Sequence, residues 1–474
     1  MMNKNVKYSV QNRRITIIVV VITAFITTFT GSALNLSIPD IGDEFSVSAG
    51  FVGWLITGYT LAVAAFSVPF GRLADITCRK TVLVVGIGIF VACCIVSVFS
   101  VSMVMLMVVR ILQGIGASMI FSTNTAVLIS AFPGNMRGKV IGYSIASTYV
   151  GLSAGPVVGG FLNHALGWRA IFIVTGIIGL ISFVAAFWKL PGDGKTPGNT
   201  EGKGEDTSEI GKSHAFDLGG NILYVMFIVL LMYGLSEINR GMISILCAVS
   251  GIIFGVLFIH HELKTETPVV NVRLFRENAG YAFSNLSALL NYGATFAISY
   301  LISIYLQVVM GYTSQAAGLI MISQPAIMAV LTPITGRVSD RFSPFKMSSA
   351  GMAFCAAGTF IFIFVGQNTS MFVIIAALAV TGFGFSLFSS PNTNAVMSCV
   401  EKADYGVASS ILATMRSIGH TLSMVIVTVI VTVNMSDMPL AEAQPAVLIK
   451  VIRLSFIIFT VICASGVFVS LKRK

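Results

Sequence analysis

The alternation of apolar and polar stretches along the chain predicts an all-α membrane protein. Fourteen apolar runs, each about 20 residues long, have the length that a helix needs to cross a bilayer. The first run, residues 15–36, is long enough to span, so we interpret it as a transmembrane helix and not as a cleavable signal peptide. The runs begin near positions 15, 51, 80, 102, 139, 169, 217, 241, 280, 315, 346, 370, 406 and 448.

An internal repeat divides these runs into two sets. The glycines, serines, asparagine and threonine of residues 114–125 recur with the same spacing in residues 382–393, always 268 positions later. The polar loop at 71–75 returns at 336–340, offset by 265 positions. Small and amide-bearing residues at matching depths in two halves indicate a solute site between those halves.

The repeat also predicts the domain organisation. Residues 1–190 form an N-terminal six-helix bundle and residues 263–474 a C-terminal six-helix bundle. Between them, residues 191–215 are rich in Gly, Pro, Ser, Thr and mixed charge, which is typical of a flexible cytoplasmic linker. Residues 216–262 hold two transmembrane helices without a counterpart in the repeat, so we interpret them as an insertion.

Composition and charge placement support this membrane topology. Only 10% of the residues are charged, against roughly 25% in soluble domains. With the N-terminus in the cytoplasm, 23 of the 29 Lys and Arg residues lie on the cytoplasmic side, as the positive-inside rule requires. We therefore expect both termini in the cytoplasm and the protein in the cell membrane. Because the net charge of +10 is spread loop by loop, binding to nucleic acid is excluded.

Four motifs then lie in the order typical of one transporter family. Residues 71–80 read GRLADITCRK, 110–117 read RILQGIGA, 151–160 read GLSAGPVVGG, and 305–319 contain YLQ, GY and AGL. They resemble the loop, fourth-span, antiporter and ninth-span motifs of the major facilitator superfamily. With fourteen spans, the chain resembles its drug:proton antiporters of the QacA and EmrB type. The resemblance implies the major facilitator fold, two pseudo-symmetric six-helix bundles plus two inserted helices, and proton-coupled efflux of hydrophobic or amphiphilic drugs by alternating access.

The repeated loop predicts a conformational latch at the inner ends of the spans. The carboxylate of Asp75 can accept hydrogen bonds from a helix N-terminus and pair with Arg72 in one state only. An ordinary turn rich in positive charge is the alternative interpretation. The predicted latch residues are Gly71, Arg72, Asp75, Arg79, Gly336, Arg337, Asp340 and Arg341.

The fifth span adds a candidate gate. Gly155 and Gly159 lie on one helix face and permit close contact with another helix, while Pro156 permits a bend. In the resembling antiporters this face controls closure of the outer side. Plain helix packing would use the same contacts.

Three ionisable side chains lie inside predicted spans. Arg110 stands about nine residues into the fourth span, where a guanidinium costs at least ~2.5 kcal/mol on insertion scales. It must therefore line a wet cavity or hydrogen-bond to helix carbonyls. Arg416 precedes His420 by one helical turn on the same face, and imidazole titrates near neutrality. We predict proton or charge handling by Arg110, Arg416 and His420; a structural role for the histidine is the alternative.

Amide side chains mark the predicted substrate cavity, because an amide in lipid is costly unless it faces a cavity or a partner helix. The repeated pair Asn124 and Asn392 are the leading candidates. Aromatic and Met residues can supply an adaptable apolar wall. The predicted cavity residues are Asn35, Tyr59, Gln113, Asn124, Asn291, Gln324, Asn392 and Asn394.

Acidic residues are missing where a cation exporter would need them. None of the 19 Asp and Glu residues lies near the middle of a predicted span, and the nearest, Asp217 and Glu237, lie at the two ends of the seventh. Thr30 stands where the first span of the resembling antiporters often has an acid. We therefore expect neutral, amphiphilic or anionic substrates, and poor transport of dications.

Secondary active transport is thus the predicted function, with protons as the coupling ion. The chain has no Walker loop and no HExxH motif, so we expect no enzyme activity, no cofactor and no metal site. A transporter of one specific metabolite, lipid or organic anion is the alternative, and a non-transporting membrane receptor or scaffold is a remote one. The expected partners are the lipid bilayer, hydrophobic small molecules and protons, and we expect a monomer.

Overall fold

Long helices that run side by side make up the structure, which is a computed structural model. It describes residues 10–132, 137–190, 217–237, 241–265, 268–270, 273–339, 342–400, 405–435 and 444–472. These ranges contain helices and connecting turns and no strand. Thirteen of the described helical segments are long and apolar enough to cross a membrane.

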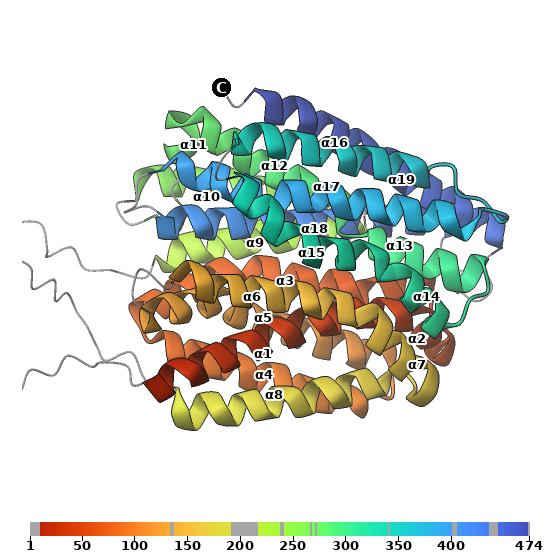
Figure 1. Cartoon of the computed structure of the whole chain (residues 1–474), viewed down its shortest axis with the longest axis horizontal. Helices are drawn as coiled ribbons and strands as arrows, with labels where there is room; N and C mark the ends of the chain where they lie inside the picture. Colours follow the sequence, from red (N-terminus) through yellow and green to blue (C-terminus); the bar gives the residue numbers. More distant parts are fainter. Residues whose placement is uncertain are drawn as a thin grey trace, which may run out of the picture.

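The N-terminal helices pack among themselves (Figure 1, red to yellow). Helix α1 lies against α5, α6 and α8, while α5 also packs on α3 and α4. The elements are α1 (Val10–Leu34), η1 (Asn35–Ser37), α2 (Ile38–Phe45), α3 (Ala49–Ile76), α4 (Arg79–Val98), α5 (Met103–Ala131), α6 (Arg137–Ala154), η3 (Gly155–Gly159), α7 (Gly160–Leu166) and α8 (Arg169–Lys189).

The C-terminal helices form a second bundle with corresponding contacts (Figure 1, green to blue). Helix α12 packs on α17, α18 and α19, and α17 also packs on α15 and α16. The elements are α11 (Arg273–Glu277), α12 (Ala279–Thr295), α13 (Ile298–Ile304), η5 (Tyr305–Val309), α14 (Ser314–Met321), α15 (Ser323–Ser339), α16 (Pro344–Phe362), α17 (Met371–Ser398), α18 (Tyr405–Met435) and α19 (Pro445–Leu471).

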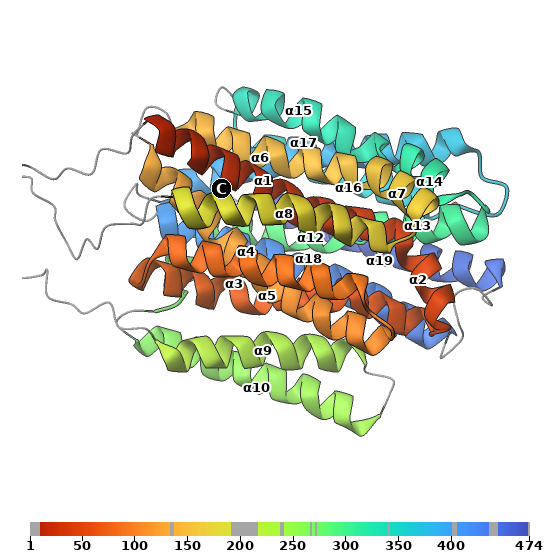
Figure 2. The ribbon, with the colours of Figure 1, turned by 90° about the horizontal axis from the view of Figure 1, so that it is seen from below.

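Two further helices, α9 (Leu218–Ser236) and α10 (Met242–Lys264), form a hairpin along one flank of the molecule (Figure 2). Helix α10 packs on α9, and α9 packs on α3 of the first half and α18 of the second. These are the inserted helices that the sequence predicts. The "linker end" denotes the end of the molecule where α1 begins, α8 ends and α9 begins; the "far end" carries α2, α7 and α14 (Figure 1).

Polar side chains between the apolar runs define where helices start. Ser48, Ser102 and Asn278 accept hydrogen bonds from the backbone amide three residues on, before α3, α5 and α12. Asp217 does the same before α9, at 2.9 Å. Such caps satisfy amide groups that the first turn leaves unpaired, so the polar stretches in the sequence mark helix starts as well as loops.

One expected span is a broken helix. The run beginning near position 139 corresponds to α6, η3 and α7; α6 and η3 pack on α1, and α7 packs on α8 and α14. The break is a single π-helical turn that begins at Gly155 and Pro156, and proline removes the amide donor that would close a regular turn. On the outside of the bundle, large apolar side chains such as Phe372 (82% exposed) and Ile243 (74%) point outward, as suits a surface that lipid solvates.

Candidate functional site

The two halves meet tightly at the far end. Ser303 of α13 donates a 2.6 Å hydrogen bond to the carbonyl oxygen of Asn35 in η1. Ser314 of α14 donates one of 3.3 Å to the carbonyl oxygen of Gly160 in α7. Gly318 of α14 lies directly against the carbonyl oxygen of Pro156, so no side chain fits there. In this structure the far end is therefore closed between the halves.

Nearer the middle, two further contacts join the halves. The hydroxyls of Thr57 in α3 and Thr428 in α18 are 3.4 Å apart, and those of Tyr149 in α6 and Ser389 in α17 are 3.1 Å apart. With the two far-end bonds they make four hydrogen bonds between the bundles within the part of the chain that the structure describes, and none of the four involves a charge. At about 0.5–1.5 kcal/mol net each, these four bonds make a modest contribution to the association of the two bundles.

The predicted gate packs against α1. A Cβ atom added at Gly155 would lie 2.5 Å from the Cβ of Ser32, and one at Gly159 would overlap Ala33. Ser32 in turn donates a 3.1 Å hydrogen bond to the carbonyl oxygen of Leu152. The glycines thus bring the broken helix into backbone contact with α1, directly beside the closed far end.

Arg110 is enclosed in the N-terminal half and 1% exposed. Its Nη1 donates to Oε1 of Gln113 at 2.5 Å, and its Nε donates to the carbonyl oxygen of Leu55 at 3.4 Å. The guanidinium carbon lies 4.2 Å from the centre of the Tyr59 ring, and Gln113 continues the chain to the Cys94 thiol at 3.0 Å. Arg110 thus forms hydrogen bonds with a side chain of its own helix and with a carbonyl oxygen of α3. Of the two environments that the sequence left open, a wet cavity or hydrogen bonds to helix carbonyls, the structure shows the second.

Arg416 and His420 form a second cluster in the C-terminal half. The guanidinium carbon of Arg416 lies 5.0 Å from the centre of the Tyr292 ring. The imidazole of His420 stacks on Phe296, with ring centres 4.2 Å apart, and meets Tyr292 edge-on at 5.2 Å. Tyr292 of α12 and Phe296, which directly follows that helix, therefore present two aromatic rings to the face of α18 that carries Arg416 and His420.

The repeated asparagines occupy equivalent places in the two bundles. Oδ1 of Asn124 in α5 accepts a 3.1 Å hydrogen bond from the hydroxyl of Thr23 in α1. Nδ2 of Asn392 in α17 donates a 3.3 Å bond to the carbonyl oxygen of Ser284 in α12. Both side chains are buried, at 5% and 2% exposed. Each amide thus joins the first and fourth long transmembrane helices of its own half.

The remaining predicted cavity residues are dispersed. Asn291 is fully buried on α12 beside the Cys355 thiol, and Gln324 is 9% exposed on α15. Asn394 of α17 donates a 2.5 Å hydrogen bond to Ser339, towards the linker end. Asn35 lies at the far end. The structure therefore brings Tyr59 and Gln113 together around Arg110, while the other predicted residues lie in separate helix contacts.

The latch is only partly within the described structure. Gly71 of α3 faces Ser122 of α5, and Gly336 of α15 faces Ser390 of α17, so the two copies of the motif sit at equivalent helix crossings. Arg72 ends up partly exposed near the end of α3, and Arg79 begins α4. Asp340 and Arg341, and the side chains of Asp75 and Arg337, lie outside the described residues.

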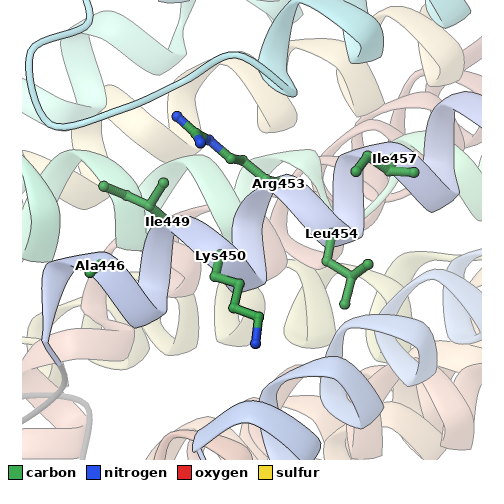
Figure 3. A pocket seen from close by; sticks show the side chains of 6 residues that line it. All are labelled: Ala446, Ile449, Lys450, Arg453, Leu454 and Ile457. Carbon is green, nitrogen blue, oxygen red and sulfur yellow. The ribbon is translucent and has the colours of Figure 1, made fainter.

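Two surface pockets lie away from the predicted cavity residues. One, of about 630 Å³, opens at the far end between the halves and is lined by Asp40, Asp43 and Glu44 of α2 together with Gln307 and Tyr312. The other, of about 300 Å³, runs along α19 (Figure 3). There Arg453 points away from Lys450 and donates a 2.8 Å hydrogen bond to the carbonyl oxygen of Val365.

One group of contacts was missed by sequence reasoning. Glu237, noted there only as the end of a span, is 5% exposed and accepts a 2.6 Å hydrogen bond from the indole nitrogen of Trp54. Tyr224 of α9 donates a 3.0 Å bond to the carbonyl oxygen of Ala64 in α3. Glu237 and Glu262 are the two acids buried among the described residues, and both lie at helix ends. The signal in the sequence that could have indicated these contacts was an acidic residue, Glu237, directly after an uninterrupted apolar run.

Comparison with known proteins agrees with this architecture. The family model described as Major Facilitator Superfamily matches residues 20–424 and, in a second match, 284–473. The chain belongs to the Major Facilitator Superfamily. It is accordingly a multi-pass membrane transporter and not an enzyme, as predicted, and the fold prediction is confirmed.

Its relatives carry different functional names. The chain is 28% identical to riboflavin transporter RibZ of Clostridioides difficile, over 86% of either chain. It is 27% identical to multidrug resistance protein Stp of Mycobacterium tuberculosis, over 82% of this chain and 70% of that one. It is 23% identical to the methylenomycin A resistance protein of Bacillus subtilis, over 90% of either chain. The resemblance to drug-resistance transporters is thus confirmed, alongside a vitamin transporter.

A solved structure shares the fold. A bacterial homologue of the human lysosomal transporter Spinster, crystallised in an inward-facing and unoccupied conformation, superposes with a TM-score of 0.70. The alignment covers 98% of this chain and 97% of that one, at 14% sequence identity. This likeness concerns the fold alone.

Proposed function

We propose that this transporter exports hydrophobic or amphiphilic compounds in exchange for protons, by alternating access between its two halves. With the linker end in the cytoplasm, as the distribution of Lys and Arg favours, the far end faces outward. The state described above would then be closed to the outside. The same orientation puts both termini in the cytoplasm.

One observation carries the proposal: each bundle is packed internally, while the described hydrogen bonds between bundles are few and uncharged. Two bundles joined in this way can rotate relative to each other about their interface. The space between them is then exposed to one side of the membrane and afterwards to the other. No nucleotide-binding motif is present in the sequence, so the energy comes from an ion gradient or from the gradient of the solute.

The buried charges indicate which substrates suit the protein. Arg110 and Arg416 lie over aromatic rings, and neither forms an ion pair with an acid among the described residues. The buried acids Glu237 and Glu262 lie at the ends of the inserted helices. Uncompensated cations disfavour a cationic guest by Coulomb repulsion. Neutral, amphiphilic or anionic substrates are therefore favoured, and dications disfavoured.

We assign separate roles to the ionisable side chains and to the amide side chains of the predicted site. Arg110, Arg416 and His420 handle charge and protons. His420 is the one among them that changes charge near neutral pH in its free form. The buried amides, led by Asn124 and Asn392, contribute polar groups to the substrate pathway when the helices that they join move apart. An amide that has lost its hydrogen-bond partner on the neighbouring helix then needs a new hydrogen-bond partner. The chain works as a monomer in this proposal.

Transport of one specific metabolite is the second candidate. It is favoured by the likeness to a riboflavin transporter, which covers most of either chain. Substrate breadth separates the two candidates: expression in a strain lacking its own efflux pumps gives resistance to several unrelated compounds in the first case, and movement of one compound in the second. A receptor or scaffold without transport is disfavoured by the family.

Flux in proteoliposomes tests the proposal. Purified protein is reconstituted, a pH gradient is imposed, and uptake of a neutral or monovalent amphiphile is compared with uptake of a divalent quaternary ammonium compound. We expect gradient-driven uptake of the former, at least tenfold faster than that of the latter. Equal rates would refute the proposed substrate class, and flux indifferent to the gradient would refute proton exchange.

A further inference from the structure

One helix of the C-terminal bundle carries several polar side chains into the protein interior. Ser284, Ser287 and Asn291 follow one another along α12 at spacings of three and four residues, which places them on one face of the helix. All three are 0% exposed. Their side-chain oxygen and nitrogen atoms form no hydrogen bond within the part of the chain that the structure describes.

This face of α12 points into the bundle. On other faces of the helix, Gly293 lies against Gly419 of α18, and Leu290 lies against Gly466 of α19. Helix α12 also packs on α16 and α17. The face that carries the three polar side chains is therefore directed towards α16 and α17, and not towards the surrounding lipid.

Asn392 of α17 meets α12 from that side. Its Nδ2 donates the 3.3 Å hydrogen bond to the carbonyl oxygen of Ser284, while its Oδ1 has no hydrogen-bond donor among the described residues. The Cys355 thiol of α16 lies beside Asn291, but it donates to the carbonyl oxygen of Thr381, 3.8 Å away. The neighbouring helices thus leave these buried polar atoms without partners.

Further polar groups extend this set to the linker end, where α12 begins beside α11 (Figure 1). Asn285 donates from Nδ2 to the carbonyl oxygen of Tyr281 at 3.0 Å. Neither Oδ1 of Asn285 nor the hydroxyl of Tyr281 forms a hydrogen bond inside the described ranges. At the other end, Asn291 precedes Tyr292, whose ring meets His420 at 5.2 Å. Together, the "polar row" consists of Tyr281, Ser284, Asn285, Ser287, Asn291 and Asn392.

The N-terminal half satisfies comparable groups by itself. Asn124 accepts its hydrogen bond from the hydroxyl of Thr23, which also lies 2.9 Å from the carbonyl oxygen of Val19. The hydroxyl of Thr27 donates to the carbonyl oxygen of Thr23 at 2.8 Å. Threonine side chains that bond to their own helix in this way need no further partner. The unsatisfied polar row therefore distinguishes α12 from α1.

We propose that the polar row binds a chain of internal water molecules along α12. A buried polar atom without a partner loses the free energy of its hydration, and water bound inside proteins makes about three hydrogen bonds to such atoms. Hydroxyl and amide groups can both donate and accept, so they orient water without changing their own charge. The chain gives the coupling proton a polar route between the linker end and the level of His420. This role, unlike the binding of water, rests on the proton exchange proposed above.

Hydroxyl-radical labelling tests the presence of the water. A short X-ray pulse makes hydroxyl radicals from water throughout the sample, including water held inside the protein, and mass spectrometry of the purified full-length chain measures the oxidation of each tyrosine. Tyr281 and Tyr305 are matched probes, because both are 0% exposed but the Tyr305 hydroxyl donates a 2.7 Å hydrogen bond to the carbonyl oxygen of Gly366. We expect Tyr281 to be oxidised several-fold faster than Tyr305. Equal rates overturn the water chain, whatever the flux measurement gives.

The pair Ser287→Ala and Ser455→Ala tests the role of the chain. Both serines are 0% exposed, but the hydroxyl of Ser455 in α19 donates a 2.8 Å hydrogen bond to the carbonyl oxygen of Val451. We expect Ser287→Ala to slow gradient-driven flux several-fold and to keep downhill flux, whereas Ser455→Ala keeps both. Removal of a dry, unsatisfied hydroxyl stabilises a protein, so a higher melting temperature in Ser287→Ala overturns the water chain. Parental gradient-driven flux in Ser287→Ala overturns the role of the chain in proton movement.

Discussion

Arg110 holds its guanidinium carbon 4.2 Å from the centre of the Tyr59 ring, with 1% of its surface exposed. The other half contains a related pair, Arg416 over Tyr292 at 5.0 Å. A desolvated guanidinium over an aromatic face gains ~2 kcal/mol or more, which offsets part of the cost of burial in a membrane. Each bundle thus keeps one arginine over an aromatic ring of its own half.

Arg110→Lys should impair gradient-driven flux at least tenfold while leaving the protein folded. An ammonium keeps the charge, but it lacks the planar fork that reaches Gln113 and Leu55 while lying on Tyr59. Flux and thermal melting of the purified protein are the measurements. Arg276→Lys is the control, because this arginine of α11 is exposed and a surface charge contributes little. Parental flux in Arg110→Lys would remove this residue from the mechanism.

His420→Gln should abolish uphill transport driven by a pH gradient and keep downhill flux within about threefold. Glutamine retains hydrogen-bonding capacity but cannot change its charge near neutral pH. Phe296→Leu, which removes the ring stacked on His420 at 4.2 Å and keeps an apolar side chain, should retain uphill transport. Preserved uphill transport in His420→Gln would show that the imidazole is structural.

Gly155→Ala should lower the melting temperature and the transport rate, because the new methyl group would lie 2.5 Å from the Cβ of Ser32. Overpacking of this kind costs about 1–3 kcal/mol. Gly31→Ala is the matched control on the facing helix, since nothing lies within 4 Å of its added Cβ. There we expect no loss, or a gain of about 0.5–1 kcal/mol from helix propensity. Equal melting temperatures in the two variants would contradict the packing described for η3.

The repeated asparagines should respond differently to the same substitution. Asn392 donates to a carbonyl oxygen, and a carboxylate cannot donate, so Asn392→Asp leaves the carbonyl of Ser284 facing a negative charge. Asn124 accepts from the hydroxyl of Thr23, which a carboxylate can still do. We expect Asn392→Asp to destabilise the protein by about 1–3 kcal/mol more than Asn124→Asp, measured by thermal melting in detergent. Equal losses would mean that the amide orientations differ from those described.

Much of the fold was predictable because a bilayer constrains sequence strongly. Spans must be apolar and about 20 residues long, and the repeat at 268 positions placed Asn124 and Asn392 at equivalent helix contacts. The side-chain partners were less predictable. Tyr59 and Gln113 were assigned to a substrate wall, yet they enclose Arg110. A helical wheel shows which face a residue occupies but not which helix that face meets.

Hydropathy, charge and repetition thus predicted a multi-pass transporter of two like halves with an inserted pair of helices, since each depends on the one-dimensional order of residues in a membrane. Only the packed bundle decided that Tyr224 and Glu237 of the inserted pair contact the seam, and that the halves close at the far end. Those contacts join residues that are far apart in the sequence, from 154 to 268 positions. Their formation depends on the tilt and rotation of whole helices, which close packing determines.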